Sequence, residues 1–96
     1  MRFEWDERKR VRNVTQHGLD FAAAKRVFDD PCVLVRLDAR RDYGEARYQA
    51  VGEVNHVVIL VAYTWRRSTC RIISARRAHD KERNAYRRAR ERQTQL

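Results

Sequence analysis

The sequence contains few of the residues that define specialised structural classes. Its 96 residues include only two cysteines, three glycines and one proline. Cys32 and Cys70 form neither a disulfide framework nor a zinc-binding pattern. So little glycine and proline excludes collagen-like chains and Pro/Gly-rich disorder. We therefore expect one globular domain over residues 1–92, with a frayed tail at residues 93–96.

Long apolar segments are missing as well. The longest apolar run covers residues 57–63, whereas a membrane-spanning helix needs about 20 residues. The first residues carry charges where a secretory signal requires an apolar stretch. We therefore expect a cytoplasmic protein without a membrane partner.

Positive charge is what the chain has in excess. Its 22 Lys and Arg residues outnumber its 13 Asp and Glu residues, which gives a net charge of +9. All but three of the basic residues are arginines, whose planar guanidinium binds phosphate oxygens in pairs and stacks on bases. A small, strongly basic domain favours a nucleic acid as its partner. An acidic protein partner would offset the same charge, so that alternative stays open.

Capping residues and hydrophobic spacing predict an α+β fold that begins with a strand and two helices. The alternation at residues 2–5 is typical of a short strand. The first helix is expected to begin at Asp6, a good N-cap, and to end at Gly18, a natural left-handed terminator. Asp20 begins a second helix, which ends before Pro31 because proline disfavours helical geometry in the residue before it.

The middle of the chain predicts a small antiparallel meander of three or four strands. Apolar patterning indicates strands at residues 32–37, 45–51, 56–63 and 69–75. The polar connections at residues 38–44, 52–55 and 65–68 are short enough for hairpins. A C-terminal helix is expected next, with Asp80 as its N-cap.

The spacing of residues offers no metal or cofactor site. His17, His56 and His79 lie far apart, and no two have the i, i+4 spacing of helical metal ligands. The three glycines are isolated, so no glycine-rich phosphate loop is present. RNA cleavage by its own 2′-hydroxyl needs no cofactor, only a base, an acid and cations at the phosphate. Composition alone does not separate such cleavage from plain nucleic-acid binding.

Each candidate residue allows a structural and a functional interpretation. Arg71 lies inside an otherwise apolar strand, where a charge is costly unless it is paired or meets a ligand. His17 either binds the last helical carbonyls or carries protons. Tyr63 either packs in the core or serves a site. Arg47 either pairs with Glu45 on one strand face or lines a groove with it.

Residues along almost the whole chain resemble one known family. The matching positions are Phe3-Glu4-Trp5-Asp6, Lys9, Asn13, His17-Gly18, Phe21, Val27-Phe28-Asp29-Asp30-Pro31, Glu45, Arg47, Gly52, Val61-Ala62-Tyr63-Thr64, Arg66, Arg71-Ile72-Ile73-Ser74-Ala75-Arg76, Glu82-Arg83 and Tyr86. In order and spacing they resemble the BrnT-type ribonuclease toxins. The chain departs from that pattern at Gln16 and Trp65, where a lysine and an acidic residue are usual.

The resemblance implies the toxin half of a bacterial type II toxin–antitoxin pair. It implies a RelE-like fold and metal-independent RNA cleavage that uses no cofactor. It also implies a cognate ribbon-helix-helix antitoxin, which forms a heterotetramer with the toxin and alone contacts operator DNA. A non-catalytic RNA- or DNA-binding module is the alternative.

For an endoribonuclease of this kind we predict the following roles. Arg71 and Arg76 would stabilise the phosphate, and His17 or Tyr63 would carry protons. The further candidates for binding RNA are Lys9, Arg47 and Arg66.

Overall fold

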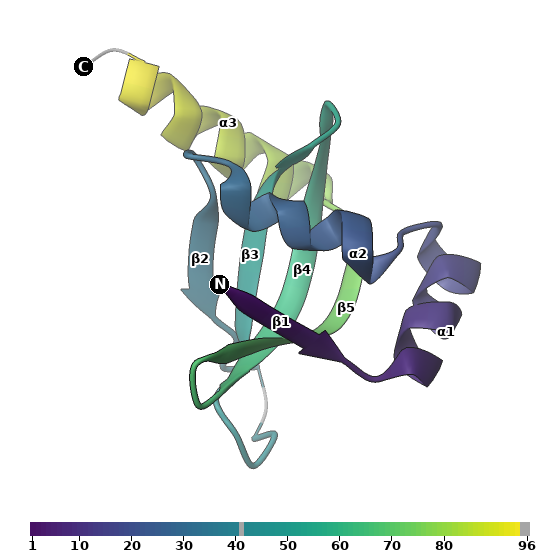
Figure 1. The fold of residues 1–96 in the computed structure, drawn as a ribbon. Coiled ribbons are helices and arrows are strands. Elements are labelled where there is room, and N and C mark those ends of the chain that lie inside the picture. Colours follow the sequence, from purple (N-terminus) through teal and green to yellow (C-terminus); the bar gives the residue numbers. More distant parts are fainter. Residues whose placement is uncertain (41, 95–96) are drawn as a thin grey trace.

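A computed structural model describes residues 1–40 and 42–94 as a five-stranded sheet with helices on both sides (Figure 1). The elements in chain order are β1 (Arg2–Trp5), α1 (Glu7–His17), α2 (Phe21–Ala24), the 3-10 helix η1 (Lys25–Asp29), β2 (Leu34–Leu37), β3 (Tyr48–Val54), β4 (Val57–Arg66), β5 (Thr69–Arg77) and α3 (Asp80–Thr94). The strand order is β1-β5-β4-β3-β2. The predicted α+β class is confirmed.

Local capping signals produce the first two helices as predicted. The Asp6 carboxylate accepts hydrogen bonds from the backbone N–H groups of Arg8 and Lys9. Gly18 ends α1 with φ of 69°, in the left-handed region that glycine adopts freely. Asp20 caps α2, which tightens after one turn into η1. The second helical segment is therefore mostly 3-10 in geometry.

The expected all-antiparallel meander is incomplete, because β1 joins the sheet as a fifth strand. It pairs in parallel with β5, from Arg2 opposite Thr69 to Trp5 opposite Ile72. The other strand pairs are antiparallel. Three helical segments, α1, α2 and η1, separate β1 from the other strands in sequence, so no local pattern indicates this pairing.

The expected turn at residues 52–55 is wrong, because β3 continues to Val54 and the chain reverses at Asn55 and His56. Gly52 serves close packing instead of a turn. A Cβ at this position would lie 2.9 Å from Val27 Cγ2, so η1 can approach β3 only over a glycine. The strand expected at residues 32–37 begins at residue 34, and that expected to end at residue 63 runs to residue 66.

The side chain of Asn13 attaches α1 to the sheet. Because β1 ends opposite Ile72, no strand of the described residues lies beyond the later part of β5. The Asn13 amide donates to Ala75 O at 2.9 Å and accepts from Ala75 N at 3.0 Å, as a neighbouring strand would do. It also donates to Leu19 O at 2.8 Å. Asn13 therefore fixes α1 beside β5.

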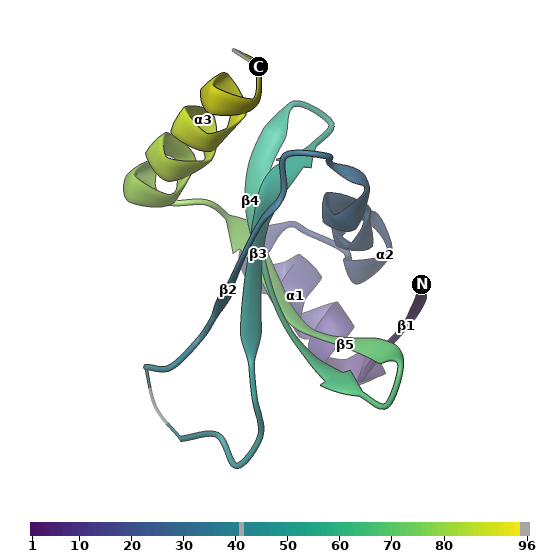
Figure 2. The ribbon, with the colours of Figure 1, turned by 90° about the vertical axis from the view of Figure 1, so that its left-hand side faces the viewer.

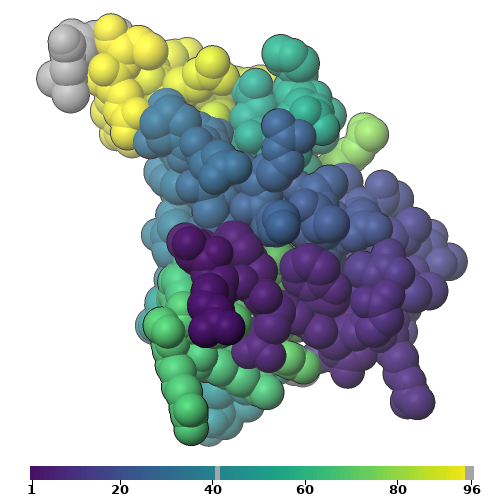
Figure 3. Space-filling model, in the orientation of Figure 1, coloured from purple at the N-terminus to yellow at the C-terminus, as the bar shows by residue number. Residues whose placement is uncertain are grey.

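One side of the sheet, which we call the helix-covered face, holds the main core. In Figure 2, α1 and α2 both lie on this side, and Figure 3 shows segments from β1 to η1 spread over it. Phe21, Ala24 and Val27 pack there against strand residues. The buried strand residues are Ala50, Ile59, Val61, Tyr63, Cys70, Ile72 and Ala75.

The opposite side, which we call the arginine face, is covered at one end only. It consists of Arg36, Gln49, Ala62, Thr64, Arg71, Ser74 and Arg76, which are linked by the strand register. Tyr86 of α3 packs on Val51, Leu60 and Ala78 at the end of this face. Figure 2 shows α3 crossing that end, on the side away from α1 and α2.

The start and end of α3 differ from the expectation. Asp80 is the first residue of the helix, and His79 takes the cap position before it. The Glu82 carboxylate accepts a hydrogen bond from the His79 N–H at 2.7 Å, as in a capping box. Residues 93 and 94 of the expected frayed tail are helical, whereas residues 95–96 lie outside the described residues. In the part that is described, no helix has the length and hydrophobicity needed to cross a bilayer.

Candidate nucleic-acid interface

A bulge in β5 places Arg71 and Arg76 on the same face of the sheet. Residues five apart in a regular strand point to opposite faces, because side chains alternate with a period of two. Here Ile72 pairs with Tyr63 and Ser74 with Ala62, so Ile73 is an extra residue. Beyond this bulge the alternation is shifted by one residue. Both arginines therefore belong to the arginine face.

Glu82 of α3 lies between two arginines of this face. Its carboxylate accepts hydrogen bonds from Arg76 Nη1 and Nη2 at 2.9 and 3.0 Å. Arg36 Nη2 approaches the same carboxylate at 3.5 Å, and Arg36 Nε donates to Gln49 Oε1 at 2.7 Å. The bonds from Arg76 lower the pKa of Glu82 to about 2, although burial acts in the opposite direction. Glu82 therefore orients both guanidinium groups.

Glu4 of β1 orients Arg71 in a similar way. Arg71 Nη1 donates to Glu4 Oε2 at 3.0 Å. The two residues are also cross-strand partners in the parallel β1–β5 pair. The Arg71 side chain keeps 23% of its surface exposed, so the pairing leaves part of this side chain in contact with solvent. The ion pair with Glu4 compensates for the energetic cost of placing the Arg71 charge inside an otherwise apolar strand.

The connection between β2 and β3 supplies Arg47. The predicted alternative of an ion pair between Glu45 and Arg47 is wrong, because Glu45 instead approaches Arg66, at 3.9 Å. The Arg47 guanidinium stacks on the ring of Tyr43, with Cζ 4.2 Å from the ring centroid. Its Nε is buried and has no hydrogen-bond partner among the described residues. Tyr43 in turn donates to Asp38 Oδ2 at 3.1 Å, which anchors the stack.

Lys9 and His17 come together beside β5 and not on the arginine face itself. They line a shallow cavity of about 170 Å³ at the junction of α1 and β5, together with Arg12. Ser74, which belongs to the arginine face, lines the same cavity. His17 is exposed at the end of α1. The cavity therefore extends the basic surface from the sheet onto α1.

Tyr63 lies apart from Arg71 and Arg76, on the other side of the sheet. Its side chain is 3% exposed on the helix-covered face. It contacts Phe28 edge-on at 5.0 Å and stacks on Tyr48 at 5.6 Å, both measured between ring centroids. Burial raises the pKa of Tyr63 to about 12, with smaller contributions from Cys70 and Tyr48. These surroundings assign Tyr63 to the core.

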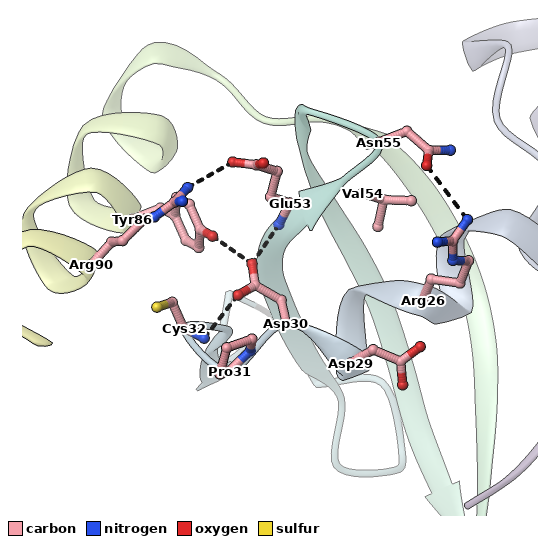
Figure 4. Close-up of a pocket in the computed structure, with 10 residues that line it drawn as sticks. All are labelled: Arg26, Asp29, Asp30, Pro31, Cys32, Glu53, Val54, Asn55, Tyr86 and Arg90. Atoms are coloured by element: carbon pink, nitrogen blue, oxygen red, sulfur yellow. Dashed lines mark hydrogen bonds and ion pairs between the residues drawn. The ribbon is translucent and has the colours of Figure 1, made fainter. Parts of the chain in front are cut away.

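The cavity shown in Figure 4 is a structural junction rather than part of the basic surface. At its wall, Asp30 accepts hydrogen bonds from the backbone N–H groups of Cys32 and Glu53, both at 2.8 Å, and from the Tyr86 hydroxyl. Burial acts to raise the pKa of Asp30, but these three bonds outweigh it and lower the pKa. Arg90 pairs with Glu53 at 2.9 Å across the same junction. Asp30 therefore ties η1, β3 and α3 together.

Sequence reasoning missed several residues of the arginine face. Glu4 and Glu82 belong to the segments that carry the family resemblance, but their sequence context indicates no role for them. Arg36 had the same signal as Arg71, a charge within an apolar strand. Gln49 and Thr64 are both buried on this face. Thr64 also belongs to a segment that carries the resemblance, whereas nothing in its sequence context marks Gln49. Among the described residues, no group of three or more His, Cys, Asp or Glu side chains is placed to hold a metal ion.

The fold and this surface define a small basic α+β domain with a candidate nucleic-acid interface on one face of its sheet. A family model described as "Ribonuclease toxin, BrnT, of type II toxin-antitoxin system" matches residues 5–82, which is more than half of the chain. The chain therefore belongs to the BrnT family of ribonuclease toxins of type II toxin–antitoxin systems. As a member of this family it has a protein antitoxin as its partner. No curated protein matches the chain.

Proposed function

We propose that the arginine face binds RNA and cleaves it without a metal ion or other cofactor, on a RelE-like fold in the bacterial cytoplasm. The observation that carries this proposal is the convergence of Arg36, Arg71 and Arg76 on a sheet face that α3 leaves partly open. Guanidinium groups held in place before the substrate arrives stabilise the charge that develops on a phosphate during cleavage.

The proposed reaction uses the RNA's own nucleophile. The 2′-hydroxyl oxygen attacks the adjacent phosphorus, its proton passes to a base, and the bond from phosphorus to the 5′ oxygen breaks. The leaving oxygen takes up a proton, which gives a 2′,3′-cyclic phosphate and a 5′-hydroxyl. Arg71 and Arg76 stabilise the phosphate, and His17 carries a proton. Lys9, Arg47 and Arg66 bind flanking phosphates.

Incubation of the purified protein with RNA in excess EDTA tests this function. We expect cleavage that leaves 2′,3′-cyclic phosphate or 3′-phosphate ends, and no cleavage of DNA, which lacks the 2′-hydroxyl. His17→Ala should lower the rate by about 10²–10⁴ with little change in RNA affinity. His56→Ala is the matched control, since His56 is exposed in the β3–β4 turn. Activity that disappears with EDTA and returns with magnesium would contradict the proposal.

The salt dependence of RNA binding tests whether the positive charge serves RNA. With about five phosphate contacts, log affinity should fall with log salt at a slope of about −3.5. A slope near zero would show that another partner uses the charge. RNA binding at this slope without any cleavage would support the alternative of a non-catalytic binding module.

We also propose that a cognate ribbon-helix-helix antitoxin neutralises the toxin. Two of each chain would form a heterotetramer that contacts operator DNA only through the antitoxin. An excess of positive charge favours a partner with acidic segments, which would offset the self-repulsion of this chain. Co-expression with the adjacent gene should relieve growth arrest and yield a stable complex. A toxin that stays free in the presence of that gene product would contradict the proposal.

A further inference from the structure

The outer edge of β2 exposes apolar side chains. β2 is an edge strand of the sheet, and Figure 1 shows it as the leftmost strand. Val35 and Leu37 are 54% and 59% exposed. Natural proteins protect the edges of their sheets with charges, prolines or covering segments, because an open edge pairs readily with another chain. An apolar open edge therefore marks a candidate interface.

The backbone of β2 is also available for pairing. The Asp38 N–H donates to Arg47 O at 2.8 Å, so these residues form a hydrogen-bonded pair. Hydrogen-bonded pairs alternate along an antiparallel ladder, so the bonds of Leu34 and Arg36 point toward β3. The N–H and C=O groups of Val35 and Leu37 consequently point away from the sheet. No strand of the described residues lies on that side.

The opposite edge of the sheet is built differently. There, the Asn13 side chain occupies both backbone hydrogen-bonding groups of Ala75. The apolar residues of β1, Phe3 and Trp5, are partly buried and pack against the main core. The chain thus covers part of this edge with its own groups but leaves the edge at β2 open.

A cavity of about 240 Å³ adjoins the open edge, between β2 and α3. Its apolar lining is Leu34, Val35, Val51 and Ala85, and its charged lining is Arg36 and Glu82. A strand added beside β2 would place alternate side chains toward this cavity and toward the opposite face, next to Leu37. The edge can therefore accept both backbone bonds and apolar side chains.

The charge of the chain identifies the occupant. A second copy would bring two chains of net charge +9 together, which is electrostatically unfavourable. Arg36 lies on β2 itself and its side chain is 60% exposed, so an acidic residue beside the strand would meet a positive partner. We propose that an extended segment of the antitoxin, with alternating apolar and acidic residues, adds to β2 as a sixth strand. This inference rests on the proposed neutralisation by the antitoxin.

Binding at β2 would also explain inhibition. Arg36 belongs to the arginine face and approaches Glu82 at 3.5 Å, and Glu82 also binds Arg76. A segment paired with β2 would lie beside this group and compete with RNA for Arg36. The antitoxin would thus block one border of the arginine face without entering the core.

Val35→Pro tests the backbone pairing. Proline lacks the N–H that the added strand requires, and at an outward-pointing edge position it leaves the ladder with β3 intact. We expect antitoxin affinity to fall by about 10-fold or more, while RNA cleavage and the melting temperature stay close to wild type. Val35→Ala is the matched control, because it shortens the side chain but keeps the N–H. Affinity lost equally in both variants would overturn pairing through this N–H.

Leu37→Asp tests the side-chain contribution without changing the backbone groups. Leu37 lies on the face opposite Arg36, so the apolar residues of the added segment would lie beside it. An aspartate there would place an unpaired charge against them, and affinity should fall by about 10-fold or more. Val11→Asp is the control, since Val11 is 52% exposed on α1. Hydrogen exchange on the wild-type complex should show the amides of Val35 and Leu37 newly protected, a result that needs no variant to fold.

The outcomes separate this inference from the proposed function. Wild-type affinity in both β2 variants, with new protection confined to α1 or α3, would overturn strand addition while leaving neutralisation intact. A wild-type toxin that does not bind the antitoxin would overturn neutralisation itself. A toxin that dimerises alone and becomes monomeric on Leu37→Asp, in analytical ultracentrifugation, would assign the edge to a second copy and overturn the inference.

Discussion

The two faces of the sheet come from the same strands but have different tasks. On the helix-covered face, Val61, Tyr63 and Ile72 are buried among apolar neighbours. On the arginine face, Arg71 and Arg76 bind glutamates and keep part of their surface in solvent. Because side chains alternate along a strand, one set of strands can carry both a core and a charged surface. Stability and function should therefore be separable by mutation.

The largest expected effect is on the helix-covered face. Phe21 is fully buried and packs edge-on against Trp5, with the ring centroids 6.0 Å apart. Phe21→Ala should lower the free energy of unfolding by about 3–5 kcal/mol, because it leaves a cavity in the core. Chemical denaturation measures this change. Arg66→Ala is the comparison on the charged surface and should cost less than about 1 kcal/mol, since Arg66 lies 3.9 Å from Glu45 and is half-exposed.

Arg71→Ala should affect catalysis strongly and stability little. If its guanidinium stabilises the phosphate, the cleavage rate should fall by about 10²–10³, which corresponds to about 3–4 kcal/mol of barrier. Single-turnover cleavage of a defined RNA measures the rate, and a thermal melt measures the fold. Arg77→Ala is the matched control, because Arg77 is exposed and pairs with Ile59 on the other side of the sheet. Equal losses in both variants would contradict a specific role for Arg71.

Glu82 should make the free energy of unfolding depend on pH. Its pKa falls from 4.5 to about 2 in the folded state, so the ionised form stabilises the fold. This contribution is complete above pH 4.5 and disappears as the pH falls through about 2. It amounts to about 3 kcal/mol at most. Glu82→Gln should therefore be less stable at pH 7 and should lose less further stability on acidification.

Urea denaturation between pH 7 and pH 2 measures the effect at Glu82. Glu91→Gln is the control, because it removes an exposed carboxylate from the same helix and leaves the Arg76–Glu82 pair in place. If the free energy of unfolding changes with pH in the same way for wild type and Glu82→Gln, the pairing with Arg76 does not link α3 to the arginine face.

The smallest effect is expected for Tyr63→Phe. The Tyr63 side chain lies on the helix-covered face, and burial raises its pKa to about 12. Removing the hydroxyl should change the cleavage rate by no more than about 2-fold, because this group is not expected to exchange protons with RNA. A loss comparable to that of Arg71→Ala, at an unchanged melting temperature, would return Tyr63 to the site and weaken the separation of the two faces.

The sequence by itself determined the features that depend on neighbouring residues. Asp6 begins α1 because its side chain accepts hydrogen bonds from the first backbone N–H groups of the helix. Gly18 ends α1 because glycine adopts the left-handed conformation freely. The apolar patterning at residues 45–51 predicts a strand, and β3 occupies most of this range, with Tyr48 and Ala50 at the main core and Gln49 on the arginine face. The whole-chain resemblance indicated the family, which the family model confirms.

Only the tertiary structure decided how distant residues meet. The extra residue Ile73 brings Arg71 and Arg76 to one face, and it is visible only in the pairing of β5 with β4. Glu45 approaches Arg66 and not Arg47, because hairpin register sets which charges become neighbours. The sequence context of Gly52 predicts a turn, whereas in the structure this glycine lies within β3 and η1 packs over it. Strand register, bulges and helix packing depend on partners far away in sequence, so local patterns could predict the elements but not the site that they assemble.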